Sequence, residues 1–516
     1  MIPGRLSKEK SIMNKSLRCL ALLLAMTLFL VGCGRQPSPE PQVVSIEMSR
    51  LPDKIEYVLN EPFSMTGAQI KINFDDDSHT LMDVRPDMAG TVSTSTPGVI
   101  TVTVFHAAGS GVFSTTFAIT VLEGDDEIDD PVNPGDDPVI MFDSRGGNHV
   151  EPIVADVGQA VTPPSDPVRE GYVFAGWYID MDVLDPYVFD TMPASGITLF
   201  ADWSSLGLTY TLNEEDDTYA VSSEDVKHLL HVEVPRRMDG RLVTEIASSG
   251  FANMSVMMSI VLPASIHTWN TGSFYNAGLL QHLHLSSRVE KILGNAFLHT
   301  YSLTSFSVDE NNPFFQVIDD VLFSKNGETL VRYPSGKENV GTYTLPAHVK
   351  IIATFAFASC YDLTNIILNH GLTTINEHAF FDATGLEAIV IPDTVTTVGM
   401  YAFRMNMNLA SVTLGSGLSG ISTYMFSDCG SLKEIILPVN ITTIGYGAFY
   451  GCHQLKRVII QKPSSMGIIQ GHLFMFQGTS SQLVIILPDQ ASVDDYGSAT
   501  YWSSFKSRMQ VASNDD

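Results

Sequence analysis

The chain has 516 residues, enough for several domains, and its 57 acidic residues outnumber its 29 basic ones. The formal net charge of −28 at pH 7 argues against binding to nucleic acid or to an anionic membrane surface, because both need Lys and Arg to neutralise phosphates. Charged residues make up only 17% of the chain, and we interpret the acidic excess as a source of solubility.

The N-terminal residues 1–32 have the parts of a secretory signal. A short basic region that begins at Met13 is followed by an apolar run over residues 19–31, and the run ends in Leu-Val-Gly-Cys at Cys33. This ending resembles a bacterial lipobox, which implies cleavage before Cys33, a diacylglyceryl lipid on its sulfur and a lipid-anchored protein exposed on the extracellular side of the cell membrane. A plain signal or an anchor helix is the alternative. We take Met13 as the true start.

Residues 33–42 are polar and rich in proline, which predicts a tether behind the lipid anchor. Residues 43–122 contain short runs of alternating polarity, such as 70–74, that predict the strands of a small β-sandwich. The phrase at 51–57, together with 69–77, resembles bacterial immunoglobulin-like domains. That resemblance implies an immunoglobulin-like module that acts as a spacer.

Residues 123–138 contain eight acids, three prolines and no base. Such a segment cannot bury a core, so the composition predicts a solvated linker. Clustered carboxylates could also hold Ca²⁺, although the regular spacing of a calcium loop is missing.

Residues 139–203 predict a compact unit of their own. The unit carries Gly-Tyr-Val-Phe-Ala-Gly-Trp-Tyr at 171–178 and ends on Trp203. It is similar to the Listeria–Bacteroides repeat, the B-repeat of internalins, which implies a β-grasp-like module of surface proteins. Trp177 and Tyr178 are aromatic candidates for ligand stacking, but in so small a unit we expect them to form the core.

One phenylalanine returns at steps of 23 residues through the C-terminal half, with a single step of 60. Most of these residues are followed six positions later by Leu, and an apolar pair with period 2 lies nine and eleven positions on, which predicts one short strand per repeat. A lone repeat cannot bury enough apolar surface to offset the entropy of ordering it, so the repeats must stack as a solenoid. The repeat positions are Phe251, Phe274, Phe297, Phe357, Phe380, Phe403, Phe426 and Phe449.

The repeat unit is most complete at 441–460, where it reads Ile-Thr-Thr-Ile-Gly-Tyr-Gly-Ala-Phe-Tyr-Gly-Cys and ends in an apolar strand. It resembles the BspA-type leucine-rich repeat, so we expect a mainly β protein whose solenoid covers residues 243–483. We predict an N-terminal cap at 204–242 and a C-terminal cap at 484–516. The long step predicts an insert hairpin near 309–346, because Asn-Gly there separates two apolar runs.

Three of the five cysteines lie in the repeats, three residues after a repeat Phe. Four other repeats hold Ala, Thr or Asn at that place, so the slot takes a small side chain and a structural role is expected for Cys360, Cys429 and Cys452. A disulfide between Cys429 and Cys452, which lie in adjacent repeats, is conceivable but not required.

No catalytic or metal-binding motif is present in the sequence, so we predict no enzyme activity, no metal and no cofactor. The candidate binding face is instead the row of residues that point outward between the inward pairs. The same row is expected from β-propensity alone, or from cover by a cap or by the insert hairpin. Its residues are His284, Ile367, Val390, Thr413, Ile436 and Ile459.

The BspA resemblance implies a surface protein that adheres to host or neighbouring cells. The predicted partners are therefore the membrane, through Cys33, and a protein or polysaccharide of another cell, bound by the solenoid, with no nucleic acid. A structural scaffold of the cell envelope without a dedicated ligand is the alternative function.

Overall fold

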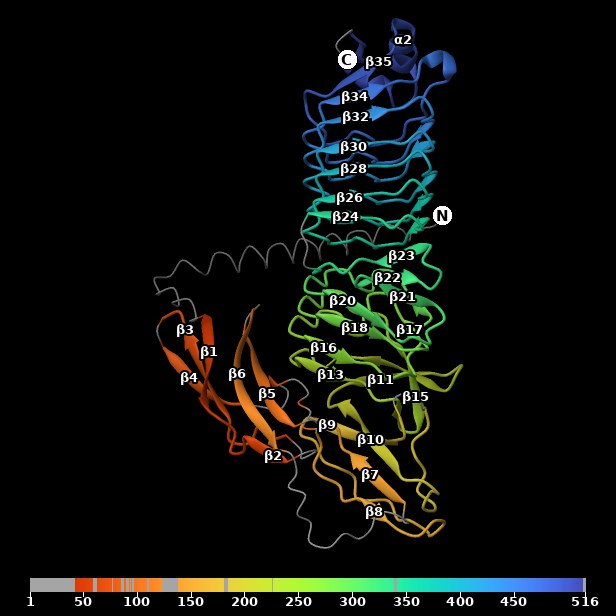
Figure 1. The fold of residues 1–516 in the computed structure, drawn as a ribbon. Coiled ribbons are helices and arrows are strands. Elements are labelled where there is room, and N and C mark those ends of the chain that lie inside the picture. The colour runs from red at the N-terminus through yellow and green to blue at the C-terminus, as the bar shows by residue number, and fades with distance from the viewer. Residues whose placement is uncertain are drawn as a thin grey trace, which may run out of the picture.

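The computed structural model describes residues 42–513 apart from 59–62, 77, 85–87, 90–91, 93, 95–96, 109–110, 123–137, 181–183, 225 and 338–340. The predicted signal, the lipidation residue Cys33, most of the tether and nearly all of the acidic linker therefore lie outside the described residues. Figure 1 shows a tall stack of short strands in the C-terminal part of the chain, and two smaller β modules before it. The protein is mainly β, as the sequence predicted.

In the described part of residues 43–122, two sheets enclose one apolar core, which is a β-sandwich arrangement. Buried residues of both sheets meet in this core, among them Ile70, Val104 and Ile119. The immunoglobulin-like relationship of this sandwich stays a prediction. One sheet contains β1 (Val43–Arg50), β3 (Gln69–Phe74) and β4 (His79–Asp83), and the other contains β2 (Glu56–Val58), β6 (Gly111–Leu122) and β5 (Gly98–Ala108).

Residues 139–205 form the second module, a single sheet with the strand order β8-β7-β10-β9. Its core is aromatic, with Trp177 4% exposed and Trp203 1% exposed. The indole Nε1–H of Trp203 donates to the backbone oxygen of Ser144 at 2.9 Å, which satisfies the one polar atom of this buried ring. Trp177 is thus a core residue, as expected, and Tyr178 is fully buried. The strands are β7 (Val139–Asp143), β8 (Ile153–Val154), β9 (Tyr172–Tyr178) and β10 (Ile197–Ser205).

Ion pairs that are largely buried join this second module to the beginning of the solenoid. Arg236 is 1% exposed, its Nη1 lies 3.4 Å from Asp202 Oδ1, and its guanidinium stacks 4.1 Å from the ring centre of Tyr178. Arg169 Nη1 pairs with Glu233 Oε1 at 2.9 Å. Breaking such a pair would leave a charge buried without a partner, so these contacts hold the module in one orientation on the solenoid.

The solenoid begins with a hairpin of β11 (Thr209–Asn213) and β12 (Thr218–Ser222), and β14 (Arg237–Met238) pairs beside it. From there each repeat contributes two parallel strands to opposite sides of the stack. One side carries β13 (His231–Glu233), β16 (Ser259–Val261), β18 (His282–Leu285) and β20 (Ser305–Val308). The other carries β15 (Arg241–Ile246), β17 (Thr268–Trp269) and β19 (Lys291–Ile292).

The later repeats continue both columns of strands. The longer strands occupy the places that the apolar pairs predicted: β26 (Asn365–Ile367), β28 (Ala388–Val390), β30 (Ser411–Thr413), β32 (Glu434–Leu437) and β34 (Arg457–Ile460). The two-residue strands on the other side form a second column that the sequence analysis missed. They are β25 (Ile351–Ile352), β27 (Thr374–Ile375), β29 (Thr397–Val398), β31 (Gly420–Ile421) and β33 (Thr443–Ile444).

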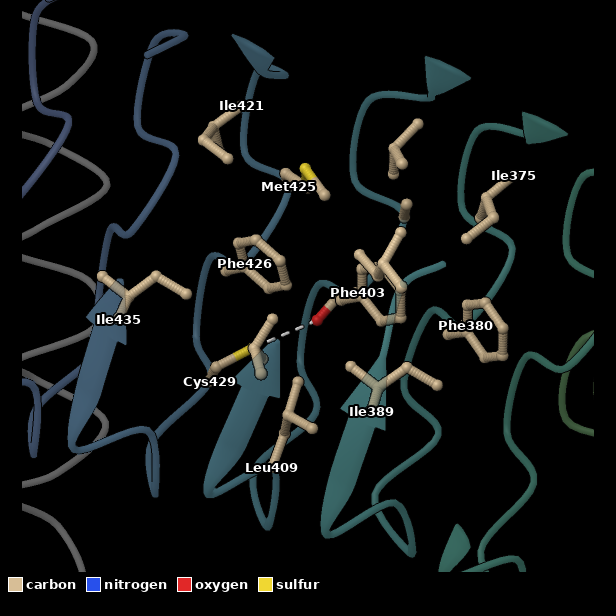
Figure 2. Close-up of a cluster of buried hydrophobic side chains, with 14 of the residues drawn as sticks. Ile375, Phe380, Ile389, Phe403, Leu409, Ile421, Met425, Phe426, Cys429 and Ile435 are labelled. Atoms are coloured by element: carbon tan, nitrogen blue, oxygen red, sulfur yellow. Dashed lines mark hydrogen bonds between the residues drawn. The ribbon is translucent and has the colours of Figure 1, made fainter. Parts of the chain in front are cut away.

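The repeat phenylalanines stack on one another between the two columns. The ring centres of Phe380 and Phe403 lie 4.8 Å apart with planes 5° from parallel, and Phe403 and Phe426 are 5.3 Å apart. Figure 2 shows these three rings in successive repeats, with Cys429 beside Phe403. The thiol of Cys429 donates to the backbone oxygen of Phe403 at 3.2 Å. Each repeat therefore completes the core of the one before it.

The three repeat cysteines are buried and free of disulfides. Cys452 donates to the backbone oxygen of Phe426 at 3.0 Å, in the same way as Cys429 one repeat earlier. Burial raises the pKa of the Cys360 and Cys452 thiols to about 12. These thiols are therefore protonated donors within the core, which agrees with the structural role expected for them.

The long step between Phe297 and Phe357 contains an irregular repeat as well as a hairpin. β21 (Phe315–Ile318), β22 (Val321–Ser324) and β23 (Thr329–Arg332) pair antiparallel, and β24 (Thr342–Thr344) follows. β23 and β24 then pair in parallel with β25 and β26, so they occupy the strand positions of a repeat. Tyr333 takes the place of the repeat Phe, with its ring 5.4 Å from Phe357.

The C-terminal end closes over the last strands. After η2 (Ser464–Met466), β35 (Val484–Leu487) and β36 (Met509–Val511) extend the sheet in parallel from β34, beyond the predicted end of the repeats at residue 483. α2 (Gln490–Ser498) is capped by Asp489, whose carboxylate accepts from the backbone N–H of Ser492, and η3 (Ser503–Arg508) follows. Trp502 is fully buried in this cap, whereas Tyr501 is exposed.

Candidate binding face

Five outward residues of β26 to β34 form what we call the apolar stripe: Ile367, Val390, Thr413, Ile436 and Ile459. Parallel pairing in register places Val390 beside Thr413 and Ile436 beside Ile459. Three of the side chains are well exposed: Ile367 by 50%, Val390 by 61% and Ile436 by 42%. The stripe is therefore an accessible row of branched aliphatic groups.

The alternation of each strand explains why these residues face outward. In the repeat at 366–368, Ile366 and Leu368 are 3% and 7% exposed and belong to the core, so Ile367 between them must point to the opposite face. The sequence pattern thus determines the direction of the side chain, but not whether another part of the chain covers it.

The C-terminal cap covers the end of this face and leaves the rest open. α2 and η3 pack against β35, where Ile486 is paired with Ile459 and only 1% exposed. Ile459 is half-buried beside it, and Ile436, one strand further from the cap, is exposed. Cover by the cap therefore applies to Ile486 and does not explain the apolar character from Ile367 to Ile436.

His284, the first residue of the predicted face, lies in different surroundings. It is exposed on β18, and its Nδ1 lies 2.8 Å from the hydroxyl of Ser307 on β20. Nδ1 of His282 lies 2.9 Å from Ser305 Oγ, and burial together with the nearby His284 lowers the pKa of His282. The structure thus separates a polar part of the face, on β18 and β20, from the apolar stripe.

One ion pair borders the apolar stripe. Arg457 Nε lies 2.7 Å from Glu434 Oε2, across the neighbouring strands β34 and β32. Glu434 and Arg457 each lie two residues before a stripe residue, Ile436 and Ile459, so they are on the same face of the sheet. A polar rim beside an apolar centre is the usual composition of a protein-binding surface.

The structure also shows a row of aromatic residues that the sequence analysis missed, which we call the outer ring ladder: Phe355, His378, Tyr401 and Tyr424. Successive ring centres lie 4.7, 4.7 and 5.3 Å apart. All four residues have positive φ, between 51° and 59°, a backbone conformation that is strained for bulky side chains. The signal in the sequence was an aromatic residue two positions before the Phe in four successive repeats.

A Ser, His and Asp group lies at the irregular repeat but lacks the geometry of a hydrolase. Nδ1 of His299 is 3.1 Å from Ser359 Oγ and 3.9 Å from Asp382 Oδ2. In a catalytic triad the acid and the serine contact opposite ring nitrogens, whereas here both approach the same one. Ser359 is also fully buried. The described residues contain no group of three or more His, Cys, Asp or Glu side chains that could hold a metal ion.

Nothing among the described residues tests the lipidation of Cys33. In that part of the chain no helix is both long enough and apolar enough to cross a membrane.

Two family models match the chain. Residues 239–348 and 350–480 match the BspA type leucine rich repeat region, in six copies, and residues 139–202 match the Listeria-Bacteroides repeat domain. The BspA-type and Listeria–Bacteroides resemblances are thereby confirmed, whereas the lipobox and immunoglobulin-like resemblances stay predictions.

Two relatives in Evansella cellulosilytica match short parts of the chain. One bears a name that describes a membrane protein and is 33% identical over 88 residues, which are 16% of this chain and 13% of that protein. The other, named for a Gly-rich membrane protein, is 38% identical over 65 residues, or 12% of this chain and 8% of that protein. The chain thus spans only a small part of the length of these relatives.

Solved structures of several bacterial proteins resemble parts of the chain. A leucine rich cell surface protein of Faecalibacterium prausnitzii is 27% identical, with 52% of this chain and 62% of that chain covered and a TM-score of 0.36. A leucine-rich repeat protein of Eubacterium ventriosum is 17% identical, with 56% and 98% covered and a TM-score of 0.37. The pneumococcal vaccine antigen PcpA is 22% identical, with 55% and 66% covered and a TM-score of 0.35.

Proposed function

We propose that this chain, which carries a BspA-type leucine-rich repeat region and a Listeria–Bacteroides repeat domain, is a surface protein that binds a partner protein through the apolar stripe. In this proposal the lipid on Cys33 anchors the chain to the cell membrane and the solenoid mediates adhesion to host or neighbouring cells. The observation that carries the proposal is the exposure of Ile367, Val390 and Ile436 in one uncovered row.

The chemistry of the stripe favours a protein partner over a polysaccharide. Sugar rings are bound by stacking on aromatic faces together with many polar contacts, but the stripe contains four branched aliphatic residues and Thr413. Branched aliphatic side chains instead gain free energy by excluding water against another apolar surface, about 25 cal/mol per Å² buried. The partner surface that fits is therefore an apolar patch of a protein.

The length of the stripe suits such a contact. Five strands spaced ~4.8 Å apart give a row of about 19 Å from Ile367 to Ile459. This length is compatible with a standard protein interface, in which each partner buries about 800 Å². The Glu434–Arg457 ion pair at the edge would lie at the rim of the contact.

The test is to measure binding of the full chain to panels of matrix proteins, glycans and purified cell walls, with Ile436→Asp measured alongside. We expect saturable binding to a protein and a loss of about tenfold or more in affinity for the variant, because a buried carboxylate replaces an apolar contact within the interface. Val439→Asp is the matched control. Val439 is 46% exposed but lies beyond the end of β32, so this variant should bind normally.

Two outcomes would contradict the proposal. Equal binding by the wild-type chain and Ile436→Asp would place the site elsewhere. Absence of binding by a well-folded chain, with tight retention by its own cell wall, would instead favour a structural scaffold of the envelope. The melting temperature of Ile436→Asp must match that of the wild-type chain, since an unfolded variant would also lose binding.

A further inference from the structure

In the irregular repeat an arginine stands at a position where most regular repeats have alanine. In the regular repeats the residue before the Phe is usually Ala, as at Ala356, Ala379 and Ala402, and it is buried. Tyr333 stands in the place of the Phe, so the corresponding residue is Arg332. Arg332 is also buried and only 1% exposed.

The guanidinium of Arg332 is buried without a counter-ion. Its Nη1 donates to the backbone oxygen of Phe355, and its Nη2 donates to the backbone oxygen of Phe297 at 3.1 Å and to Ser335 Oγ at 3.4 Å. Its Nε has no hydrogen-bond partner, and among the residues that the structure describes no Asp or Glu pairs with it. Burial accordingly lowers the pKa of Arg332. An uncompensated buried cation is costly, so the site favours an anion.

A cavity of about 380 Å³ lies against this arginine. Regular repeats make an outer turn with positive φ two residues before the Phe, but the residue at that place in the irregular repeat is Val331, within β23. The irregular repeat therefore lacks this outer turn. The cavity lies in the space that is left between the outer turns of the preceding and the following repeat. The lining includes Leu293, Gly294, Val331, Arg332, Thr354 and Phe355.

Phe355 forms the end of the outer ring ladder beside this cavity. Its ring stacks on His378, in the following repeat, at 4.7 Å. His378 and Tyr401 each have a stacked ring on both sides, whereas the ring contacts found for Phe355 are with His378 and Phe381, which both follow it in the chain. Phe355 therefore contributes an aromatic wall to the cavity, and Thr354 and Asn376 add polar groups.

We propose that this cavity binds an organic carboxylate carried on a six-membered ring, with the carboxylate next to Arg332 and the ring against Phe355. The volume lies at the small end of the range for ligand pockets, about 300–1,000 Å³, so one ring with its substituents fits and a longer chain does not. A bare inorganic anion would satisfy the charge but leave the apolar walls without contacts. A neutral sugar would leave the guanidinium uncompensated. The site is separate from the apolar stripe and does not depend on it.

The test is titration calorimetry on the full chain with four probes: glucuronate, benzoate, glucose and inorganic phosphate. We expect saturable binding of at least one ring carboxylate, with glucose and phosphate weaker by about tenfold or more. Tighter binding of glucuronate would identify an acidic sugar as the ligand class, and tighter binding of benzoate an aromatic acid. Equal affinity for all four probes, or no binding of either ring carboxylate, would overturn the proposal.

Three variants locate the site. Arg332→Gln removes the charge and Phe355→Ala removes the ring, and each should weaken the ring carboxylate by about tenfold or more. Tyr401→Ala is the matched control, because Tyr401 has the same place in the ladder and positive φ but does not line the cavity. If Arg332→Gln fails to fold, Phe355→Ala and Tyr401→Ala still decide the question. Equal losses in these two variants would contradict the assignment.

Discussion

The solenoid has two segments that share a repeat and differ on the outside. In the first segment Phe251, Phe274 and Phe297 stack inside, and in the second Phe357 to Phe449 do the same. At the strand position of the apolar stripe, the first segment has Val261, His284 and Ser307, whereas four of the five strands from β26 to β34 in the second segment have an aliphatic residue. The outer ring ladder begins only at Phe355, in the second segment.

This difference shows that the two faces of one repeat serve separate purposes. The inward residues satisfy the same packing in every repeat, because each must fill the space between two neighbours. The outward residues have no such constraint, and their change to mainly aliphatic side chains after the irregular repeat is consistent with the proposed binding surface. The apolar stripe lies in the second segment, whereas the cavity beside Arg332 lies at the boundary between the two segments.

The largest expected effect comes from removing a stacked ring in each segment. Phe274 and Phe403 are both fully buried, but they belong to separate apolar clusters. Replacing either by Ala should lower the free energy of unfolding by about 3–5 kcal/mol. Hydrogen exchange should then show faster opening mainly in the segment that carries the change. Equal acceleration in both segments would mean that they unfold as one unit.

A smaller effect is expected at the slot three residues after the Phe. In the second segment Asn406 is fully buried and donates to the backbone oxygens of Phe380 at 2.7 Å and Phe403 at 2.8 Å, which ties two repeats together. Thr300, in the first segment, donates at 2.8 Å to Phe297 of its own repeat. Asn406→Ala should cost about 1–3 kcal/mol in chemical denaturation, because two buried acceptors lose a donor.

Two matched substitutions check this explanation. Thr300→Val, which removes one short bond within its own repeat and a longer contact of 3.4 Å with Ser335 Oγ, should cost less than Asn406→Ala. Ser411→Ala, at an exposed strand position, should change stability by no more than about 0.5 kcal/mol. A cost for Asn406→Ala as small as that for Ser411→Ala would show that the amide does not link the repeats.

The smallest expected effect is a pH dependence of the outer ring ladder. His378 lies between Phe355 and Tyr401, and burial lowers its pKa, with Glu377 opposing and Arg404 reinforcing the shift. Above the ordinary histidine pKa of about 6.5 the ring is neutral in both states, so its stability contribution is complete. As the pH falls below that value the unfolded chain binds the proton first, and stability decreases.

His378→Phe should remove this part of the acid sensitivity. Thermal melts of the wild-type chain and of His378→Phe between pH 7.5 and 5 measure it, and the two curves should diverge as the pH falls. Parallel curves would mean that protonation of His378 does not oppose folding. Because the outer ring ladder lies in the second segment, the divergence should appear in the opening of that segment.

Much of the solenoid followed from the period of the sequence. A Phe every 23 residues, with a Leu and an apolar pair at constant distances, determined the repeats, the place of the longer strands and the inward direction of residues such as Ile366. The two-residue strands on the opposite side were missed, because two residues are too few for a period to be visible. Their pairing exists only between repeats.

The irregular repeat was hidden for a related reason. Val331-Arg332-Tyr333 does not look like the Ala-Phe motif, and its distances of 36 residues from Phe297 and 24 from Phe357 break the period. Stacking of Tyr333 on Phe357 assigns it, and that contact depends on the surrounding repeats. The cavity beside Arg332 arises from the same exception and could not be foreseen from the pattern.

By itself, then, the sequence determined the solenoid and the row of residues that face outward, because these depend on local alternation and on a period. The tertiary structure decided which of those residues are accessible: the cap buries Ile486, half-buries Ile459 and leaves Ile436 exposed. It also decided that Arg332 is buried without a carboxylate. Accessibility and charge compensation depend on which distant segments pack against a residue, and neighbouring positions in the sequence do not contain that information.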